Sequence, residues 1–297
     1  MAADRLPLLL DTDLGTNVDD ALALAYAVRH PGVDLQGVLT VSGDSVRRAQ
    51  LAQALLRAAG RADVPVRAGR PGFEERAWSG HEGRGMPPGW EQETVPSGGW
   101  EELLAGFGGT LVTLGMLTNL ATLLQHGTRP PLHRLVVMGG LFPPTDLPLG
   151  RDHNLVTDPE SAAVALGAGY PTLLVPVDVT VRTGLLPRHV DRLRGGDPLA
   201  QLLAGLLDAF VPRTGHAVSG GRVAHLHDPL AVACAVDAAF VRSCVRIERL
   251  PITVARRGAG VRTFVDPLAG TPTDVVRDVD VDAVAAHWLQ VVLEGRP

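Results

Sequence analysis

Residues 8–21 read LLLDTDLGTNVDDA, and three leucines run directly into four carboxylates, those of Asp11, Asp13, Asp19 and Asp20. An apolar run of this length is typical of a buried strand, and a helical pattern follows it. Carboxylates crowded where a strand passes into a helix repel one another unless a cation joins them. Oxygen ligands suit a hard cation such as Ca²⁺ or Mg²⁺ rather than zinc. The stretch therefore predicts a metal site at the end of the first strand.

Helix capping is a simpler interpretation of the same stretch, because Asp and Asn are common at helix N-termini. Capping would account for Asn17 or Asp19. It would not also account for Asp11 and Asp13, which a period of two places on the same face of the strand. We therefore favour the metal site.

Short apolar runs alternate with helical patterns along the chain. The predicted strands are Leu6–Asp13, Val33–Val41, Val64–Gly69, Thr110–Leu114, Arg134–Gly139, Pro171–Val177, Ile247–Val254 and Val261–Val265. The predicted helices are Asp19–Arg29, Ser45–Ala59, Asn119–His126, Pro159–Gly167, Pro198–Val211, Pro229–Val236 and Asp282–Leu293. This alternation predicts one α/β domain over residues 1–297, with a doubly wound, mostly parallel sheet. Such sheets bind ligands outside the carboxyl ends of their strands.

The overall composition argues against several classes of protein. The 297 residues are 45% hydrophobic and carry a net charge of -5, with acidic and basic residues mixed along the chain. This balance argues against nucleic acid or an anionic membrane as the main partner. All 27 basic residues are arginines. The absence of lysine excludes Schiff-base catalysis by a lysine and a P-loop with its lysine. No signal peptide or transmembrane segment is expected, so we predict a cytoplasmic protein.

A second polar motif, HLHDP, occupies residues 225–229 and precedes an apolar helix. A His-Asp pair at a helix start is often only a cap. Here, however, Asp228 would add a distant carboxylate to the first cluster. His227 could act as an acid toward a leaving group, because histidine titrates near neutral pH.

Two further segments of the chain carry residues that could belong to a binding site. In the turn after the strand Thr110–Leu114, Gly115 permits close backbone approach. Asp158 and its following proline predict the start of another helix. Asp152 and Asn154, just before it, are suited to binding hydroxyl groups.

Five motifs, taken in order, resemble the inosine–uridine nucleoside hydrolase family, in the branch with the longer DTDxGTxxDDA opening motif. They are DTDLGTNVDDALAL, TLGMLTNLATLL, LVVMGG, DHNLVTDPESA and HDPLAVA, and the resemblance covers nearly the whole chain. It implies a Rossmann-like α/β fold, helices on both faces of the sheet, and a homodimer or homotetramer. It also implies a Ca²⁺-dependent N-ribohydrolase that cleaves a nucleoside, or a related ribosyl compound, to ribose and free base with a metal-activated water.

The resemblance implies roles for the residues that match the family motifs. Asp13 would bind the metal and take the proton from the attacking water. Asp20, Asp228 and the main-chain carbonyl of Leu114 would complete the metal ligands. His227 would assist departure of the base.

Other matching residues would support the reaction or contact the substrate. Asp19 and Asn154 match contacts to ribose hydroxyls, and Asp11 matches a supporting residue of the opening motif. His81 lies where the family has a histidine near the nucleobase.

The chain also departs from the family pattern around the sugar. Asn17 stands where this branch usually has Asp, and Asp44 stands where many members have an Asn that touches ribose. Asp152 replaces a Glu that reaches the 5′-hydroxyl. Pro143 and Pro144 occupy the place of a Gly-Asn pair. These departures alter the 5′ end of the predicted sugar pocket but leave the metal ligands in place.

Two other functions remain as alternatives. LLLDTDLGT resembles the opening motif of haloacid-dehalogenase-like phosphohydrolases, in which Asp11 would be the nucleophile. Gly15 stands where that motif has Thr or Val, and the usual downstream lysine is missing. The altered sugar pocket would also fit a metal-dependent ribosyl-ligand binder that has lost catalysis, although the presence of Asp13 and His227 argues against it.

Overall fold

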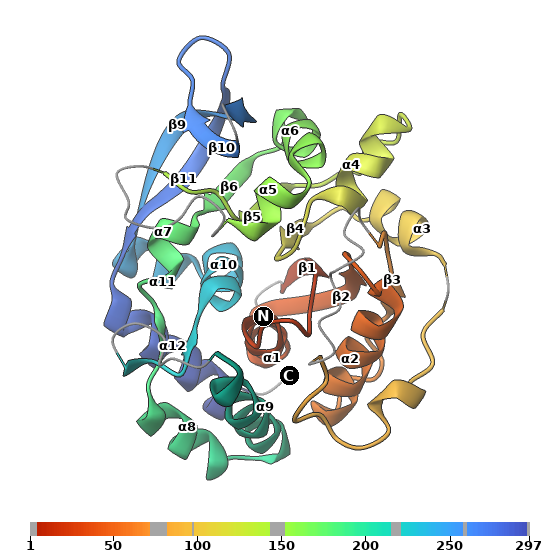
Figure 1. Cartoon of the computed structure of the whole chain (residues 1–297), viewed down its shortest axis with the longest axis vertical. Coiled ribbons are helices and arrows are strands. Elements are labelled where there is room, and N and C mark those ends of the chain that lie inside the picture. Colours follow the sequence, from red (N-terminus) through yellow and green to blue (C-terminus); the bar gives the residue numbers. More distant parts are fainter. Residues whose placement is uncertain are drawn as a thin grey trace.

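A nine-stranded sheet lies at the centre of the protein in a computed structural model, which describes residues 5–71, 82–96, 98–142, 152–214, 221–257 and 260–295. Its strand order is β10-β9-β11-β6-β5-β4-β1-β2-β3 (Figure 1). These strands are β1 (Leu6–Thr12), β2 (Val33–Thr40), β3 (Val66–Ala68), β4 (Thr110–Thr113), β5 (Arg134–Met138), β6 (Thr172–Val175), β9 (Val245–Arg257), β10 (Gly260–Val265) and β11 (Thr271–Val279). A separate antiparallel pair consists of β7 (Gly184–Leu185) and β8 (Ala224–His225).

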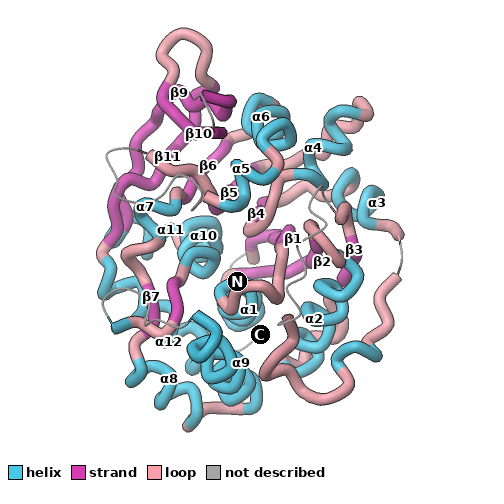
Figure 2. The backbone as a smooth tube through the Cα atoms, viewed as in Figure 1, coloured by secondary structure: helices cyan, strands magenta, loops and turns pink. Residues whose placement is uncertain are grey.

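Helices surround this sheet (Figure 2). They are α1 (Asp19–Arg29), α2 (Ser45–Ala58), α3 (Trp100–Ala105), α4 (Thr118–Gln125), α5 (His153–Thr157), α6 (Pro159–Gly167), α7 (Val177–Thr180), α8 (Pro187–Arg194), α9 (Pro198–Thr214), α10 (His227–Val236), α11 (Ala238–Cys244) and α12 (Val281–Glu294), with a 3-10 turn, η1, at Trp90–Gln92. Across the residues described, none of these helices combines the length and the apolar character needed to cross a bilayer.

Both faces of the sheet are covered, as the side chains of β1 show. Leu8 and Leu10 join one buried cluster, which also contains residues of α1, α2, α9, α10 and α12. Leu9, which points to the other face, joins a second cluster with residues of α3, α4 and α6. The strands from β11 to β3 in the sheet order pair in parallel. The predicted α/β fold, doubly wound and mostly parallel, is therefore confirmed.

The far edge of the sheet departs from the parallel pattern. Strand β9 pairs antiparallel with both β11 and β10. The sequence analysis did not predict β11, whose polar Asp274, Arg277 and Asp278 interrupt its buried valines. It also did not predict α3, α5, α7, α8 and α11, each of which has eight residues or fewer. Four of these helices have seven residues or fewer, which are too few turns to show a clear period.

The order in which successive strands are added to the sheet reverses beside β1: β2 and β3 follow on one side of it, and β4, β5 and β6 follow on the other. Strand β1 pairs with β2 on one side and with β4 on the other. The helices after β1 and β4 therefore diverge, which opens a crevice outside the carboxyl ends of these two strands. Asp13 follows β1 and Leu114 follows β4, so both residues lie at this crevice.

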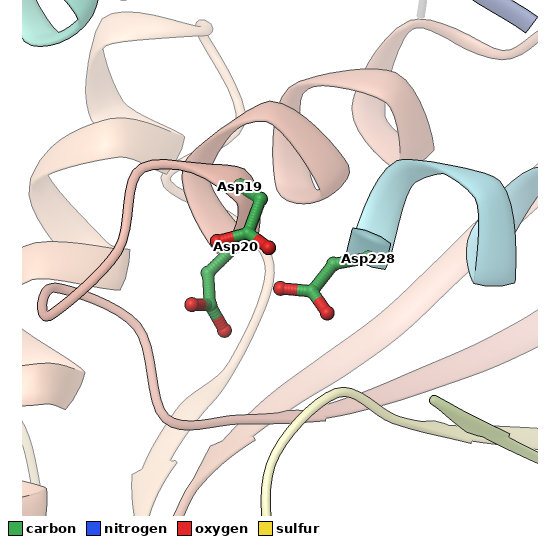
Figure 3. Close-up of side chains that lie close together, drawn as sticks. All are labelled: Asp19, Asp20 and Asp228. Carbon is green, nitrogen blue, oxygen red and sulfur yellow. The ribbon is translucent and has the colours of Figure 1, made fainter. Parts of the chain in front are cut away.

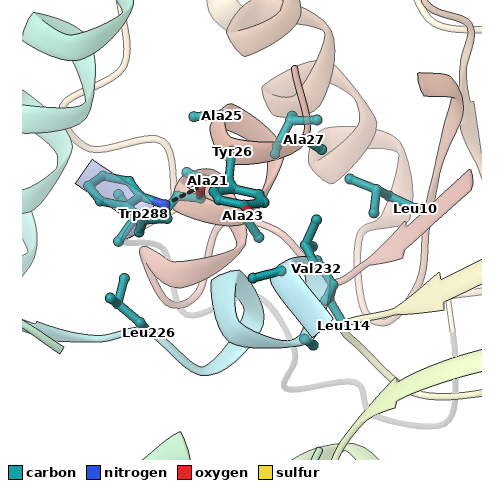
Figure 4. Packing of buried hydrophobic residues seen from close by; sticks show 14 of the residues in the cluster. Leu10, Ala21, Ala23, Ala25, Tyr26, Ala27, Leu114, Leu226, Val232 and Trp288 are labelled. Atoms are coloured by element: carbon teal, nitrogen blue, oxygen red, sulfur yellow. Dashed lines mark hydrogen bonds between the residues drawn. The ribbon is translucent and has the colours of Figure 1, made fainter. Parts of the chain in front are cut away.

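Helix α1 lies in the interior of the protein (Figure 4). Its residues from Asp19 to Val28 are all buried, and alanines at every second position from Ala21 to Ala27 keep it thin. It packs against α10 and α12. The indole Nε1 of Trp288 in α12 donates a hydrogen bond to the carbonyl oxygen of Leu22 at 3.0 Å. This packing fixes the N-terminus of α1 and, with it, the two aspartates of its first turn.

Candidate active site

Three buried aspartates meet where α1 and α10 begin (Figure 3). Asp19 and Asp20 occupy the first turn of α1, and Asp228 occupies the first turn of α10. One carboxylate oxygen from each lies within 4.8 Å of the other two. The positive ends of two helix dipoles point toward this cluster and partly offset its negative charge.

The cluster carries an electrostatic cost that a cation would remove. Burial raises the pKa of the Asp19 carboxyl to about 7, and the neighbouring Asp13 charge adds to the effect. Burial and the adjacent carboxylates also raise the pKa values of Asp20 and Asp228 well above the ordinary range. The Arg48 charge opposes this shift at Asp20. Buried donors that are all oxygen and mutually repulsive fit a hard divalent cation.

These aspartates form part of the wall of a cavity of about 320 Å³. Most of the residues that the sequence analysis selected line the same cavity. The lining comprises Asp13, Thr16, Asn17, Asp19, Asp20, Arg48, Glu82, Leu114, Met138, Asp152, His153, Asn154, Val177, Val181, His227 and Asp228. The structure thus brings together polar side chains from five regions of the chain at the crevice beside β1.

A buried arginine holds the loop that carries Asp13. The Arg48 side chain, which is 1% exposed, donates hydrogen bonds to the carbonyl oxygens of Asp13 and Leu14, the latter at 2.8 Å. It also donates from Nε to the carbonyl of Ser42 at 2.9 Å. Arg48 thus binds three carbonyl oxygens on two separate loops, and these hydrogen bonds join the two loops beside the crevice. The sequence analysis missed this role because an arginine within a helix usually faces solvent.

Leu114 also lines the cavity, and its carbonyl oxygen accepts a hydrogen bond from another lining residue. The Asn154 amide donates to it at 2.5 Å and to the Met138 carbonyl at 3.0 Å. A carbonyl oxygen has two lone pairs, so this contact leaves one acceptor site for a second partner. A Cβ atom built at Gly115 would lie 3.1 Å from the Cβ of Asp13. The glycine therefore permits the close approach that its sequence position predicted.

His227 is the first residue of α10, and it also lines the cavity. Its Nδ1 lies 2.6 Å from the hydroxyl oxygen of Thr180, at the end of α7. Thr180 belongs to no motif that the sequence analysis recognised. Its four-residue helix follows a strand directly, and no periodic signal marked it.

Asp152 lines the cavity and also caps a helix. Its carboxylate accepts a hydrogen bond from the backbone N–H of Leu155 at 3.2 Å and so caps α5. Burial raises its pKa to about 6, although hydrogen bonds from Leu155 and Gly140 oppose the shift.

Two predicted site residues, Asp11 and Asp44, are not among the described residues that line the cavity. Asp44 caps α2 by accepting a hydrogen bond from the backbone N–H of Arg47 at 3.0 Å, and its side chain is 43% exposed. Asp11 is fully buried and accepts a hydrogen bond from the Asn119 amide at 2.9 Å. His81, like the prolines at positions 143 and 144, lies outside the described residues.

Glu82 is a further cavity residue that the sequence analysis did not select. It is 6% exposed, and the hydroxyl of Thr16 donates to its carboxylate at 3.3 Å. Its position beside His81 in an aperiodic segment was the only available signal. It adds another acidic group to the same side of the cavity as the β1–α1 loop.

Comparison with known proteins identifies the class to which this fold and site belong. A family model described as inosine-uridine preferring nucleoside hydrolase matches residues 8–286. The chain therefore belongs to the inosine-uridine preferring nucleoside hydrolase family, whose members are enzymes that act on N-glycosyl bonds.

Two relatives are 30% and 32% identical to the chain over the aligned residues. The pyrimidine-specific ribonucleoside hydrolase RihA of Klebsiella pneumoniae subsp. pneumoniae is 30% identical over 251 residues, which are 77% of this chain and 78% of the relative. RihA of Photobacterium profundum is 32% identical over 250 residues, which are 76% of this chain and 78% of the relative.

Solved structures show the same fold. The purine-preferring ribonucleoside hydrolase from Gardnerella vaginalis superimposes with a TM-score of 0.80 at 24% identity, over 96% of this chain and 98% of that one. The inosine-uridine preferring nucleoside hydrolase from Bacillus anthracis gives a TM-score of 0.77 at 20% identity, over 97% and 99%.

The metal-free protein should become less stable as the pH rises from 3.8 to about 7. The Asp19 carboxyl keeps its proton up to about pH 7 in the folded state, but its ordinary pKa is 3.8. Between these values the folded state binds more protons than the unfolded state, so the free energy of unfolding falls with increasing pH. Each such proton contributes at most about 1.4 kcal/mol per pH unit. Urea unfolding in EDTA at several pH values would measure the slope.

Asp19→Asn is the matched control for this prediction, because the amide does not titrate. The variant should show a shallower fall in stability than the wild-type protein over the same pH range. Identical slopes would contradict the shifted ionisation of Asp19.

Proposed function

We propose that this protein is a calcium-dependent N-ribohydrolase that cleaves a ribonucleoside, or a related ribosyl compound, to ribose and a free base. One observation carries this proposal. The buried cluster of Asp19, Asp20 and Asp228 shares a cavity with Asp13 and His227, in a chain of the nucleoside hydrolase family.

Cleavage of a glycosidic bond passes through a transition state with positive charge on the sugar ring. Carboxylates beneath the sugar would stabilise that charge. When bound, Ca²⁺ would polarise the attacking water and hold the ribose hydroxyls. Asp13 would take the proton of the water, and His227 would give a proton to the leaving base.

We assign Asp13, Asp20, Asp228 and the carbonyl of Leu114 as the ligands that would hold the cation. The carboxylate of Asp19 groups with those of Asp20 and Asp228. The match to the family motif, rather than this geometry, is the reason to place Asp13 among the ligands and to give Asp19 a ribose hydroxyl beside the cation. The Asn154 amide, which already reaches the Leu114 carbonyl, would bind the neighbouring hydroxyl.

Pyrimidine ribonucleosides are the first substrates to test, because the RihA relatives are named as pyrimidine-specific. Purine nucleosides belong in the same panel, since a solved structure of the same fold is named as purine-preferring. Asp152 reaches less far than a glutamate and is engaged as a helix cap. We therefore expect weaker discrimination at the 5′-hydroxyl than at the 2′- and 3′-hydroxyls.

The test is the release of reducing sugar from a panel of nucleosides, with protein treated with EDTA and then supplied with Ca²⁺ or Mg²⁺. We expect release only after the cation is restored, and faster release with Ca²⁺. Asp63→Asn is a suitable control for handling, because Asp63 is exposed, pairs with Arg61, and is not among the described residues that line the cavity.

Other outcomes would favour the alternatives. Calcium and ribose binding in calorimetry without sugar release from any nucleoside would favour a binder. Phosphate release from phosphate esters, abolished by Asp11→Asn, would favour the phosphohydrolase. A cytoplasmic location and a homodimer or homotetramer remain part of the proposal, for cell fractionation and sedimentation to test.

A further inference from the structure

The His227 side chain forms a hydrogen bond with the hydroxyl of a buried threonine. Thr180 is fully buried, and its Oγ1 lies 2.6 Å from Nδ1 of His227. His227 lines the cavity, whereas Thr180 is not among the described lining residues. The ring therefore directs Nδ1 toward the protein interior. Nε2, on the opposite edge of the ring, is the nitrogen through which a proton would reach a substrate.

A second contact of Thr180 favours one direction for this hydrogen bond. Its Oγ1 also lies 3.4 Å from the carbonyl oxygen of Val177, three residues earlier. Threonine hydroxyls in helical turns commonly donate to such a carbonyl. A hydroxyl has only one proton. If Thr180 donates that proton to Val177, its oxygen must accept the Nδ1–H of His227, and this contact then sets both the orientation and the tautomer of the ring.

The two segments that carry Thr180 and His227 are tied to each other. The hydroxyl of Thr183 donates to the Thr180 carbonyl at 2.7 Å and lies 3.4 Å from the Leu226 carbonyl. His225 places its Nδ1 3.2 Å from the Thr183 carbonyl, and β7 pairs with β8 directly alongside. The hydroxyl of Thr180 is thus fixed relative to the start of α10.

We propose that Thr180 is a positioning residue, which fixes the ring orientation and the tautomer of His227 so that Nε2 faces the leaving base. The inference rests on the proposed function. In the step it supports, the Nε2–H bond breaks and an N–H bond forms on the base, while the electron pair of the sugar–base bond moves into the base. The ring then regains a proton from solvent.

The choice of leaving group separates this role from a merely structural one. A nucleoside base needs a proton to leave, but 4-nitrophenolate leaves as a stable anion. We expect Thr180→Val, which keeps the side-chain shape without the hydroxyl, to lower kcat for a cleaved nucleoside by about 100-fold. Hydrolysis of 4-nitrophenyl β-D-ribofuranoside should change by less than about threefold. Thr180→Ser, which restores the hydroxyl, should recover most of the nucleoside activity.

A double-mutant cycle sharpens the test. In a His227→Ala background, Thr180→Val should cause no further loss on the nucleoside, because its effect acts through the ring. In the wild-type protein, ¹⁵N NMR of the neutral His227 ring should find the proton on Nδ1. This measurement requires no variant to fold.

Each contrary result has a distinct meaning. Equal losses on both substrates, independent losses in the double variant, or a neutral ring protonated on Nε2 would overturn the role of Thr180 while leaving the proposed function standing. A wild-type protein that releases ribose from neither substrate in the presence of Ca²⁺ would overturn both.

Discussion

Replacing Asp13 with alanine should lower the kcat of ribose release by about 10²- to 10⁴-fold, the range expected when a general base is lost. Asp13 lies half-buried in the cavity, and Arg48 holds its main-chain carbonyl rather than its side chain. The loop should therefore keep its course in the variant. Because Asp19 and Asn154 still line the cavity, KM should change much less than kcat. Steady-state kinetics at saturating Ca²⁺ would measure both constants.

Asp13→Asn provides a second version of the same test. The amide oxygen still offers a ligand to a cation, but it cannot accept the proton of the water. We expect the Asn variant to bind Ca²⁺ better than the Ala variant while remaining equally impaired in turnover. If Asp13→Asn kept more than about a tenth of the wild-type kcat, another group would have to be the base. Asp63→Asn should behave as the wild type.

Replacing Asp228 with asparagine should have two effects of opposite sign. The dissociation constant for Ca²⁺ should rise by more than about 100-fold, since residues that merely support metal ligands already cost 10- to 100-fold. The metal-free protein should instead become more stable, because one of three mutually repelling buried carboxylates is removed. Each kcal/mol gained would raise Tm by roughly 2–4 °C.

Calorimetric titration with Ca²⁺ would give the binding constants, and thermal unfolding with EDTA or with Ca²⁺ would give the stabilities. In the wild-type protein Ca²⁺ should raise Tm strongly, since a ligand of the folded state stabilises it. In Asp228→Asn this difference should nearly vanish. A variant that is less stable without metal and binds Ca²⁺ normally would show that Asp228 is a structural cap and no ligand.

The sequence predicted the framework because its signals are local. The run of leucines before Asp11 predicted β1, and the alternation of strands and helices predicted a sheet with two covered faces. Each strand that reaches the site is buried on both sides, so it reads as an unbroken apolar run. Strand β11 was missed because it lies where the sheet becomes antiparallel, and charged residues such as Asp274 break its pattern.

The sequence also placed most of the cavity residues, because they sit at strand ends that a parallel sheet brings together. The sequence did not reveal the residues that position the cavity residues through hydrogen bonds. Arg48 braces Asp13 from a helix, and Thr180 meets His227 from a turn of four residues. Neither contact leaves a periodic or motif signature, since each depends on segments that are distant in sequence. Asp44 is the opposite case, because the sequence analysis selected it as a substrate contact, whereas its side chain caps α2 and is not among the described lining residues.

The burial of α1 has a consequence for the order in which the protein can be assembled. This helix leaves the ribosome well before α10 and α12, against which it packs. Contacts between such distant parts of a chain form slowly, because a long loop must close first. During synthesis the apolar residues of α1 therefore lack these native partners until α10 and α12 have been made. The carboxylates of its first turn are joined by that of Asp228 only after α10 has been synthesised and has packed against α1.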